Sequence, residues 1–251
     1  MGYDPQVLSV LHRPHDARPP GRAPKRGLGA RLALGAGAAA VVAVPFTLLM
    51  LLVLSEWEPL DRLDRGVADS LNDVARSESG LVEVLDIGEV AFSPWVFRIV
   101  VLAVAVWLWR RGAKRLAAWA VVTIAIGGVL GVVLKLLVDR ARPSFPEPVA
   151  HASGYSFPSG HALNSAVTYL TIGALLARAE SKRTVRLYLI GVAVLLTLII
   201  GASRVYLGVH WPSDVLAGWS VGAAWAVLVS LVARALQRRR TIEREPPPEQ
   251  D

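Results

Sequence analysis

The sequence predicts an all-α integral membrane protein, a polytopic bundle of six transmembrane helices. The 251-residue chain is 53% hydrophobic. Its apolar residues are gathered in runs that approach or reach the roughly 20 residues needed to cross a bilayer. Segments rich in Arg and Lys separate several of these runs, as in loops on the cytoplasmic side of a membrane.

The ends of the chain differ from its apolar middle. Residues 1–31 are rich in Pro, Gly and Arg and lack apolar periodicity, so we expect a disordered basic tail. The first apolar run, 32–54, is expected to be a retained helix, because a signal peptide has a shorter apolar core and a small-residue cleavage site. Residues 237–251 are expected to form a polar tail. Residues 32–236 would then form one membrane domain.

An acidic segment, residues 56–80, follows the first run. Five apolar residues recur there at the spacing of one helical face: Leu60, Leu63, Val67, Leu71 and Val74. This pattern predicts an amphipathic helix lying on the membrane or on the bundle. Four acids share the segment: Asp61, Asp64, Asp69 and Asp73. They lack the spacing of a metal-binding loop, so we expect a solvated polar face.

Five more spans are expected at about 90–109, 116–138, 162–177, 187–202 and 215–236. Arg98 lies one turn inside the second span. We expect it to be structural, either reaching the membrane interface or pairing within the bundle.

The basic residues predict the orientation of the bundle. They are concentrated in the N-terminal tail, in the loops after the second and fourth spans, and after the sixth span. Cytoplasmic loops carry an excess of Lys and Arg, so both termini are expected in the cytoplasm of a plasma-membrane protein. The segment 56–80 and the segments that follow the third and fifth spans would then lie on the extracytoplasmic side.

The composition also limits the function. The net charge of +7 could fit nucleic acid, but its distribution fits membrane orientation, and no nucleic-acid partner is expected. The chain has no cysteine, which excludes disulfides, thiolate metal sites and a Cys nucleophile. The carboxylates and histidines lack metal-ligand spacing, so neither a metal nor another cofactor is expected.

His210 and Asp214 are four residues apart and share a helical face if the turn at Trp211-Pro212 opens the last span. Asp214 could then accept a hydrogen bond from one ring nitrogen and fix the tautomer of His210. The other nitrogen would serve as a nucleophile. Direct activation of water by His210 is the alternative.

Ser159, Gly160 and His161 precede the fourth apolar run and follow a proline. Free N–H groups at a helix start, with a glycine that permits close approach, make a phosphate seat. His161 is expected to protonate the leaving group as a general acid.

Three cations lie in the same extracytoplasmic segments: Lys135, Arg142 and Arg204. Fixed cations stabilise the oxygens of a phosphoryl group in the transition state of its transfer. Asp139 is expected to hold Lys135, four residues away, and His151 is expected to be a loop residue.

These residues resemble the three-part signature of the type-2 phosphatidic acid phosphatases. The matching parts are Lys135 with Arg142-Pro143, the quartet from Pro158 to His161, and Ser203-Arg204 with His210 and Asp214. That family includes membrane lipid phosphate phosphatases and is related to soluble acid phosphatases and vanadium haloperoxidases.

The resemblance implies a role for each matching residue. Phosphate would be bound by Lys135, Arg142, Ser159, Gly160 and Arg204. His161 would protonate the leaving group, and His210, held by Asp214, would form a phosphohistidine. It also implies a six-helix core and metal-independent hydrolysis of a lipid phosphate at the outer face of the membrane.

The resemblance does not choose among undecaprenyl diphosphate, phosphatidylglycerophosphate and phosphatidic acid as substrate. A lipid phosphotransferase using the same phosphohistidine is one alternative. A non-enzymatic transporter or structural membrane protein is another, although its charges would lie near mid-span rather than at helix ends. The sequence does not predict the oligomeric state.

Overall fold

A computed structural model describes residues 28–244, which form helices and loops without a β-strand. The chain divides into two units, residues 1–34 and 35–251. The first unit is described only from Leu28, where α2 begins. The helices are α2 (Leu28–Leu54), α3 (Glu58–Ser77), α4 (Ser79–Ala91), α5 (Pro94–Arg110), α6 (Lys114–Val138), α7 (Gly160–Ser165), the π-helical turn η1 (Ala166–Leu170), α8 (Thr171–Ala179), α9 (Arg183–Tyr206) and α10 (Pro212–Arg244). For the described residues, the all-α prediction is confirmed.

Within residues 28–244, three helices are long and apolar enough to cross a membrane: α6, α9 and the part of α10 over Pro212–Val229. The number rises to five if two bent pairs each count as one span, α2 with α3 at 96° and α4 with α5 at 42°. The fourth predicted span, 162–177, is divided between α7, η1 and α8, and none of these reaches spanning length by itself. The count of six spans therefore stays a prediction.

Some helix boundaries match the predicted spans closely, as for α6, and others differ from them. Helix α9 exceeds its predicted span of 187–202 at both ends, and α10 continues past residue 236 to Arg244. The helix α4, over Ser79–Ala91, was not predicted. Most of the predicted N-terminal tail, 1–27, and the last residues, 245–251, lie outside the described residues.

The predicted amphipathic helix is present as α3, but its buried residues are small or polar, while Leu60 and Leu71 of the apolar face are only partly buried. The buried residues of α3 are Asp64, Ala68, Asn72 and Ala75. Leu63 is 59% exposed, and Val67 and Val74 are also exposed. The expectation that Asp64 belongs to a solvated face is therefore wrong, because this small and polar stripe is packed against the protein.

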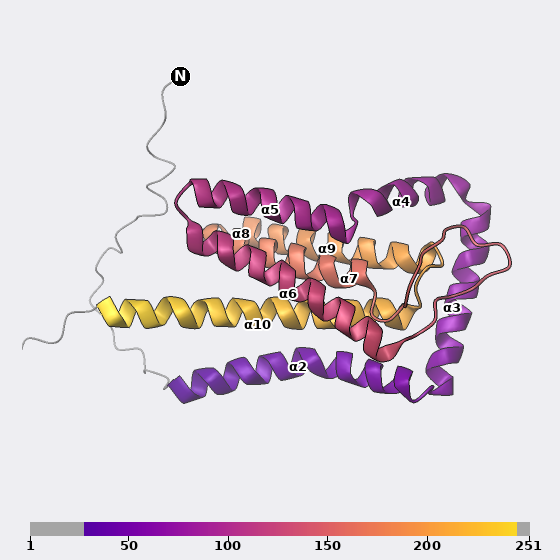
Figure 1. The fold of residues 1–251 in the computed structure, drawn as a ribbon, viewed down its shortest axis with the longest axis horizontal. Coiled ribbons are helices and arrows are strands. Elements are labelled where there is room, and N and C mark those ends of the chain that lie inside the picture. Colours follow the sequence, from indigo (N-terminus) through magenta and orange to yellow (C-terminus); the bar gives the residue numbers. More distant parts are fainter. Residues whose placement is uncertain (1–27, 245–251) are drawn as a thin grey trace, which may run out of the picture. The chain divides into compact units, whose positions relative to one another are not determined.

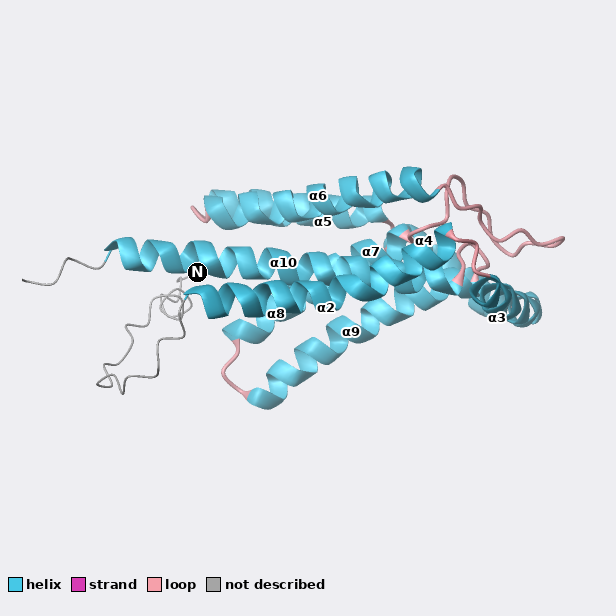
Figure 2. Cartoon of the chain, turned by 90° about the horizontal axis from the view of Figure 1, so that it is seen from below, coloured by secondary structure: helices cyan, strands magenta, loops and turns pink. Residues whose placement is uncertain are grey.

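Within the unit 35–251, α3 lies across one end of the other helices (Figure 1), where it contacts α9 and α10. The long loop from α6 to α7, residues 139–159, is found at the same end, and a view turned by 90° agrees (Figure 2). The start of α10 and the segment 207–211 before it meet this loop through hydrogen bonds. This end of the bundle therefore gathers the sequence-predicted site residues.

Two glycines on α10 allow α7 to pack closely. A Cβ added at Gly218 would lie 2.7 Å from the backbone oxygen of Ser159, and one at Gly222 would lie 2.7 Å from the backbone oxygen of Leu163. Small residues four apart are a common device for close helix packing in membranes. Next to this contact, Leu163 belongs to a buried cluster with Val167, Val221, Ile124 and Leu134, which joins α6, α7, η1 and α10. The first turn of α7 is thus fixed against the first turns of α10.

Candidate active site

Arg142 joins two segments of the site that are far apart in sequence. It follows α6 in the 139–159 loop, and its Nε and Nη2 donate to the backbone oxygens of Gly154 and Ser153 at 2.9 and 3.0 Å. Its Nη1 donates to the backbone oxygen of Val209 at 2.6 Å and lies 3.2 Å from Nε2 of His210. Burial lowers the pKa of the guanidinium from its ordinary value. The planar fork therefore fixes the 153–154 turn and the 209–210 turn around one cation.

His210 stands between a cation and a carboxylate. Its Nε2 faces Arg142, and its Nδ1 lies 3.4 Å from Oδ2 of Asp214. Helix α10 begins at Pro212, as the spacing of the two residues required. His210 is 3% exposed, and this burial is the main reason that its pKa falls from 6.5 to about 4, although Asp214 opposes the shift. The imidazole is therefore neutral at pH 7, with Nδ1 on the carboxylate side and Nε2 on the cation side.

Ser159, Gly160 and His161 form the start of α7. Ser159 donates its backbone N–H to the backbone oxygen of Asp214 at 3.0 Å, so this segment lies against the first turn of α10. A Cβ added at Gly160 would meet nothing within 4 Å, which leaves open space beside the predicted phosphate seat. His161 lies within electrostatic range of Arg204 and His210, and its buried Nε2 has no hydrogen-bond partner among the described residues. The imidazole thus retains a free polar atom close to both groups.

Lys135 lies on the last turn of α6, which ends at Val138. Its ammonium donates to the backbone oxygen of Tyr155 and, at 3.5 Å, to that of Ser156. The expected pairing with Asp139 is not among the ion pairs of the described residues. Asp139 instead takes a left-handed conformation with φ of 53° and ends the helix. The loop carbonyls, rather than a carboxylate, hold Lys135 at the site.

Arg204 is the third predicted cation, and it has a partner that the sequence did not predict. Its Nη1 lies 2.9 Å from Oε2 of Glu89, on α4. The approach is close enough for an ion pair, but Nη1 lacks an aligned hydrogen-bond acceptor among the described residues. The hydroxyl of Ser203 accepts from Nε and Nη2 at 3.2 and 3.1 Å. Arg204, only 2% exposed, is thus held by a serine and a carboxylate.

Two further charged residues surround Asp214. Arg140 donates from Nη1 to Oδ1 of Asp214 and from Nη2 to Oδ2 of Asp64, both at 2.8 Å. Neither Arg140 nor Asp64 was predicted as a site residue. The signal for Arg140 was present, since it lies between Lys135 and Arg142 in the same motif. No pattern in the acidic segment distinguishes Asp64 from its neighbours, because its partners are distant in sequence.

Other predicted residues lie apart from this group. Arg98 stacks over Trp95 at 4.6 Å and packs against Gly128 of α6, in keeping with a structural role. His151 is exposed in the loop, as expected. No group of three or more His, Cys, Asp or Glu side chains within the described range is arranged to hold a metal ion.

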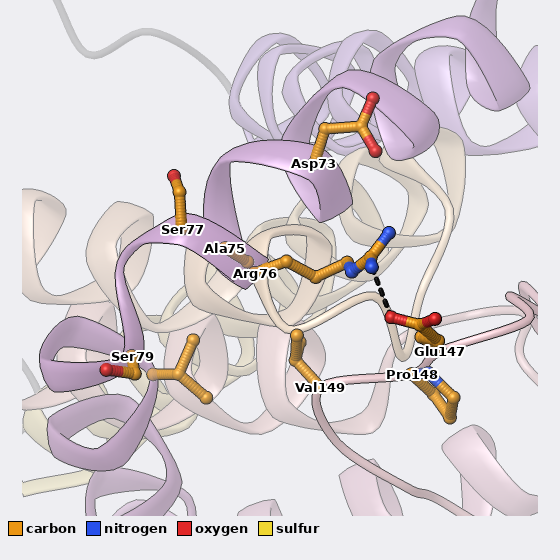
Figure 3. Close-up of a pocket in the computed structure, with 9 residues that line it drawn as sticks. Asp73, Ala75, Arg76, Ser77, Ser79, Glu147, Pro148 and Val149 are labelled. Atoms are coloured by element: carbon orange, nitrogen blue, oxygen red, sulfur yellow. Dashed lines mark hydrogen bonds and ion pairs between the residues drawn. The ribbon is translucent and has the colours of Figure 1, made fainter.

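A pocket near the α3–α4 junction does not coincide with the charged group. Figure 3 shows Arg76 and Glu147, which form an ion pair across it. Its remaining lining comes from residues 73–82 and 148–149, so it contains none of the predicted site residues. Open volume is therefore a poorer guide to the site than the convergence of two histidines, three cations and a buried carboxylate.

Comparison with known proteins agrees with the signature. A sequence profile of the PAP2 superfamily matches residues 116–238. Phosphatidylglycerophosphatase B of Bacillus subtilis is 40% identical over 115 residues, which cover 45% of this chain and 55% of the relative. Decaprenylphosphoryl-5-phosphoribose phosphatase of Mycobacterium tuberculosis is 34% identical over 145 residues, covering 57% of this chain and 74% of the relative. The chain thus spans about half the length of the first curated relative and about three quarters of the second.

The fold is also similar to a solved one. The crystal structure of a transmembrane PAP2-type phosphatidylglycerolphosphate phosphatase from Bacillus subtilis aligns with a TM-score of 0.61 at 24% sequence identity. The alignment covers 78% of this chain and 97% of that one. The matched profile includes all eight residues that the sequence assigned to the site. The family prediction is confirmed, and the chain belongs to the PAP2 superfamily.

Proposed function

We propose that this protein is a lipid phosphate phosphatase of the membrane. It hydrolyses a lipid phosphomonoester or diphosphate through a phosphohistidine on His210. The observation that carries the proposal is the position of His210, with Nδ1 3.4 Å from the Asp214 carboxylate and Nε2 3.2 Å from the Arg142 guanidinium. A phosphoryl group bound by Arg142 would lie next to the ring nitrogen that is free to attack it. Both relatives above carry the names of lipid phosphatases, which supports the choice of substrate class.

The first chemical step is the transfer of the phosphoryl group to His210. Asp214 accepts the Nδ1–H hydrogen bond, so the lone pair on Nε2 attacks phosphorus. The bond between phosphorus and the leaving oxygen breaks, and His161 supplies a proton to that oxygen. The positive charge that develops on the imidazole is balanced by the buried Asp214. Lys135, Arg142 and Arg204 would bind the phosphoryl oxygens, with the serine and glycine at 159–160.

The second step returns His210 to its free form. A water molecule attacks the phosphohistidine, His161 takes a proton from that water, and inorganic phosphate is released. The P–N bond breaks and its electron pair returns to Nε2. His161 gives up a proton in the first step and regains one from water in the second.

The site is proposed to open on the extracytoplasmic side of the plasma membrane. The segments 135–161 and 203–214 contribute to one charged group, so they share a side. The loop between α8 and α9 contains Lys182, and Arg183 opens α9, whereas the segments near the site carry buried and paired charges. The excess of basic residues on cytoplasmic loops supports this orientation. Both termini would then be cytoplasmic.

Phosphate release by the detergent-purified protein tests the proposal. The assay compares phosphatidylglycerophosphate, undecaprenyl diphosphate and phosphatidic acid, with EDTA present and without any acceptor lipid. We expect release of inorganic phosphate from at least one of them, and a loss of at least about 1,000-fold in His210→Ala, as when an activated nucleophile is removed. His151→Ala is the matched control, since it removes an exposed histidine from the same side of the protein. Equal rates for the two variants would refute the nucleophile, and release only with an acceptor lipid would indicate a phosphotransferase instead.

A further inference from the structure

We infer that Asp64 is a positioning residue of the active site, which acts through Arg140 to fix the carboxylate of Asp214. The inference rests on the proposed function, because it assigns a task to α3 in that reaction. The amphipathic pattern places Asp64 among solvated acids. In the structure this residue is completely buried, with 0% exposure.

Asp64 accepts hydrogen bonds from the first turn of α10. Its Oδ1 accepts from the backbone N–H of Ser213 at 3.0 Å, and its Oδ2 accepts from the hydroxyl of the same serine. The first N–H groups of a helix have no partner within the helix, and a carboxylate there is also favoured by the helix dipole. Asp64 therefore caps α10 from another helix, one residue before Asp214.

Arg140 connects the two carboxylates. Its fork places Nη2 2.8 Å from Asp64 and Nη1 2.8 Å from Asp214, and its side chain is only 14% exposed. Nη1 also donates to the hydroxyl of Ser213 at 2.7 Å. A buried carboxylate is costly unless it is paired, so one guanidinium between two acids leaves each acid with a fixed partner. Arg140 thereby occupies Oδ1 of Asp214 and leaves Oδ2 for other donors.

The free oxygen is the one that faces the proposed nucleophile. Oδ2 of Asp214 lies 3.4 Å from Nδ1 of His210 and accepts the backbone N–H of Trp211 at 2.9 Å. If Asp64 were neutral, Asp214 would be the only one of the two carboxylates still negatively charged beside the guanidinium of Arg140. The fork would then turn to bind both oxygens of Asp214 and draw Oδ2 away from His210. The charge of Asp64 thus keeps the Asp214–His210 contact available.

The test uses the full-length protein in detergent and the best substrate of the lipid phosphate panel. Asp64→Asn keeps the shape of the side chain and removes its charge. We expect kcat to fall about 10- to 100-fold, as for other residues that orient a catalytic group, with KM within about twofold of wild type. Asp69→Asn is the matched control, because Asp69 is an exposed acid on the same helix. We expect it to match wild type.

A split between kcat and KM separates positioning from a purely structural role. If Asp64 only attached α3 to the bundle, Asp64→Asn would lower the thermal midpoint and the yield of folded protein, while the folded fraction kept its kcat. That result would overturn the inference. A wild-type protein without phosphatase activity would instead overturn the proposed function, so the two failures are distinguishable.

A second variant covers the case in which Asp64→Asn does not fold. Arg140→Lys keeps a positive charge between the two carboxylates, so neither acid is left without a cation and the variant should fold. It lacks the planar fork that fixes both acids at once. We expect it to be at least about 10-fold slower than wild type. Turnover at the wild-type rate would overturn the inference.

Discussion

Glu89 and Arg204 form an ion pair, with 2.9 Å between Oε2 and Nη1, at a cation that the proposed mechanism assigns to phosphate. The carboxylate comes from α4, a helix that the sequence did not predict, and its side chain is 28% exposed. Glu89 thus gives Arg204 a negative partner of the kind that a phosphate would also provide. A bound phosphate anion has to share Arg204 with Glu89 or displace it.

Removal of this charge should therefore tighten the binding of anions. We expect Glu89→Gln to lower the inhibition constant of inorganic phosphate about 3- to 10-fold, because the guanidinium loses a competing partner and the site becomes more positive. Competitive inhibition in the phosphate-release assay measures the change. Glu83→Gln, an exposed acid on the same helix, is the control and should have no effect. Weaker inhibition in Glu89→Gln would show that Glu89 orients Arg204 for phosphate and does not compete with it.

The lowered pKa of His210 predicts how kcat/KM depends on pH. Burial lowers this pKa from 6.5 to about 4, against the opposing effect of Asp214. Attack needs the neutral imidazole, so kcat/KM should rise with pH through a limb near pH 4 and be level with respect to this group above pH 6. A profile of kcat/KM from pH 3 to pH 8 checks it, with the His151→Ala variant as the control. An acid limb at pH 6.5 would show a solvated histidine and would contradict the buried position.

The same shift affects the stability of the protein. The unfolded chain binds a proton at His210 below about pH 6.5, whereas the folded protein does so only near pH 4. Between these values the unfolded state holds more protons, so the free energy of unfolding falls as the pH falls. The thermal midpoint of wild type should therefore decrease over that window more than that of His210→Ala. Equal slopes would mean that another group governs the acid stability.

Features that depend on a local stretch of sequence were predicted, whereas the packing of α3 was not. Apolar runs identified α6, α9 and α10, because membrane-spanning length is a local property. The proposed site residues came from a motif that can also be read along the chain. The expectation that Asp64 belongs to a solvated face was wrong, because a helix next to lipid can expose its leucines and valines and bury small or polar residues. Asp64 shows this reversal.

Ion pairs between residues that are far apart in sequence were also not predicted. Glu89 meets Arg204 and Asp64 meets Arg140 only after α3 and α4 have packed at one end of the bundle. Asp64 lies among other acids in the segment 56–80, and Glu89 lies in α4, a helix that was not predicted, so nothing local marks either residue. Arg140, in contrast, lies two residues before Arg142 in a motif where every charge near an apolar run is costly unless it is paired. That cost was a usable signal for a buried partner.

The absence of cysteine from the 251-residue chain makes the proposed orientation directly testable. Single cysteines introduced at exposed loop positions would be the only thiols in the protein. Ser144 lies in the loop between α6 and α7, beside the site, and Ser181 lies in the loop between α8 and α9.

We expect a membrane-impermeant maleimide to label Ser144→Cys in intact cells. Ser181→Cys should be labelled only after the membrane is permeabilised, since the loop between α8 and α9 is assigned to the cytoplasm. Before labelling, both cysteine variants should still release phosphate, which verifies that they are folded. The reverse labelling pattern would place the charged group on the cytoplasmic side, and labelling of both positions in intact cells would show that α8 and its neighbours do not cross the membrane between them.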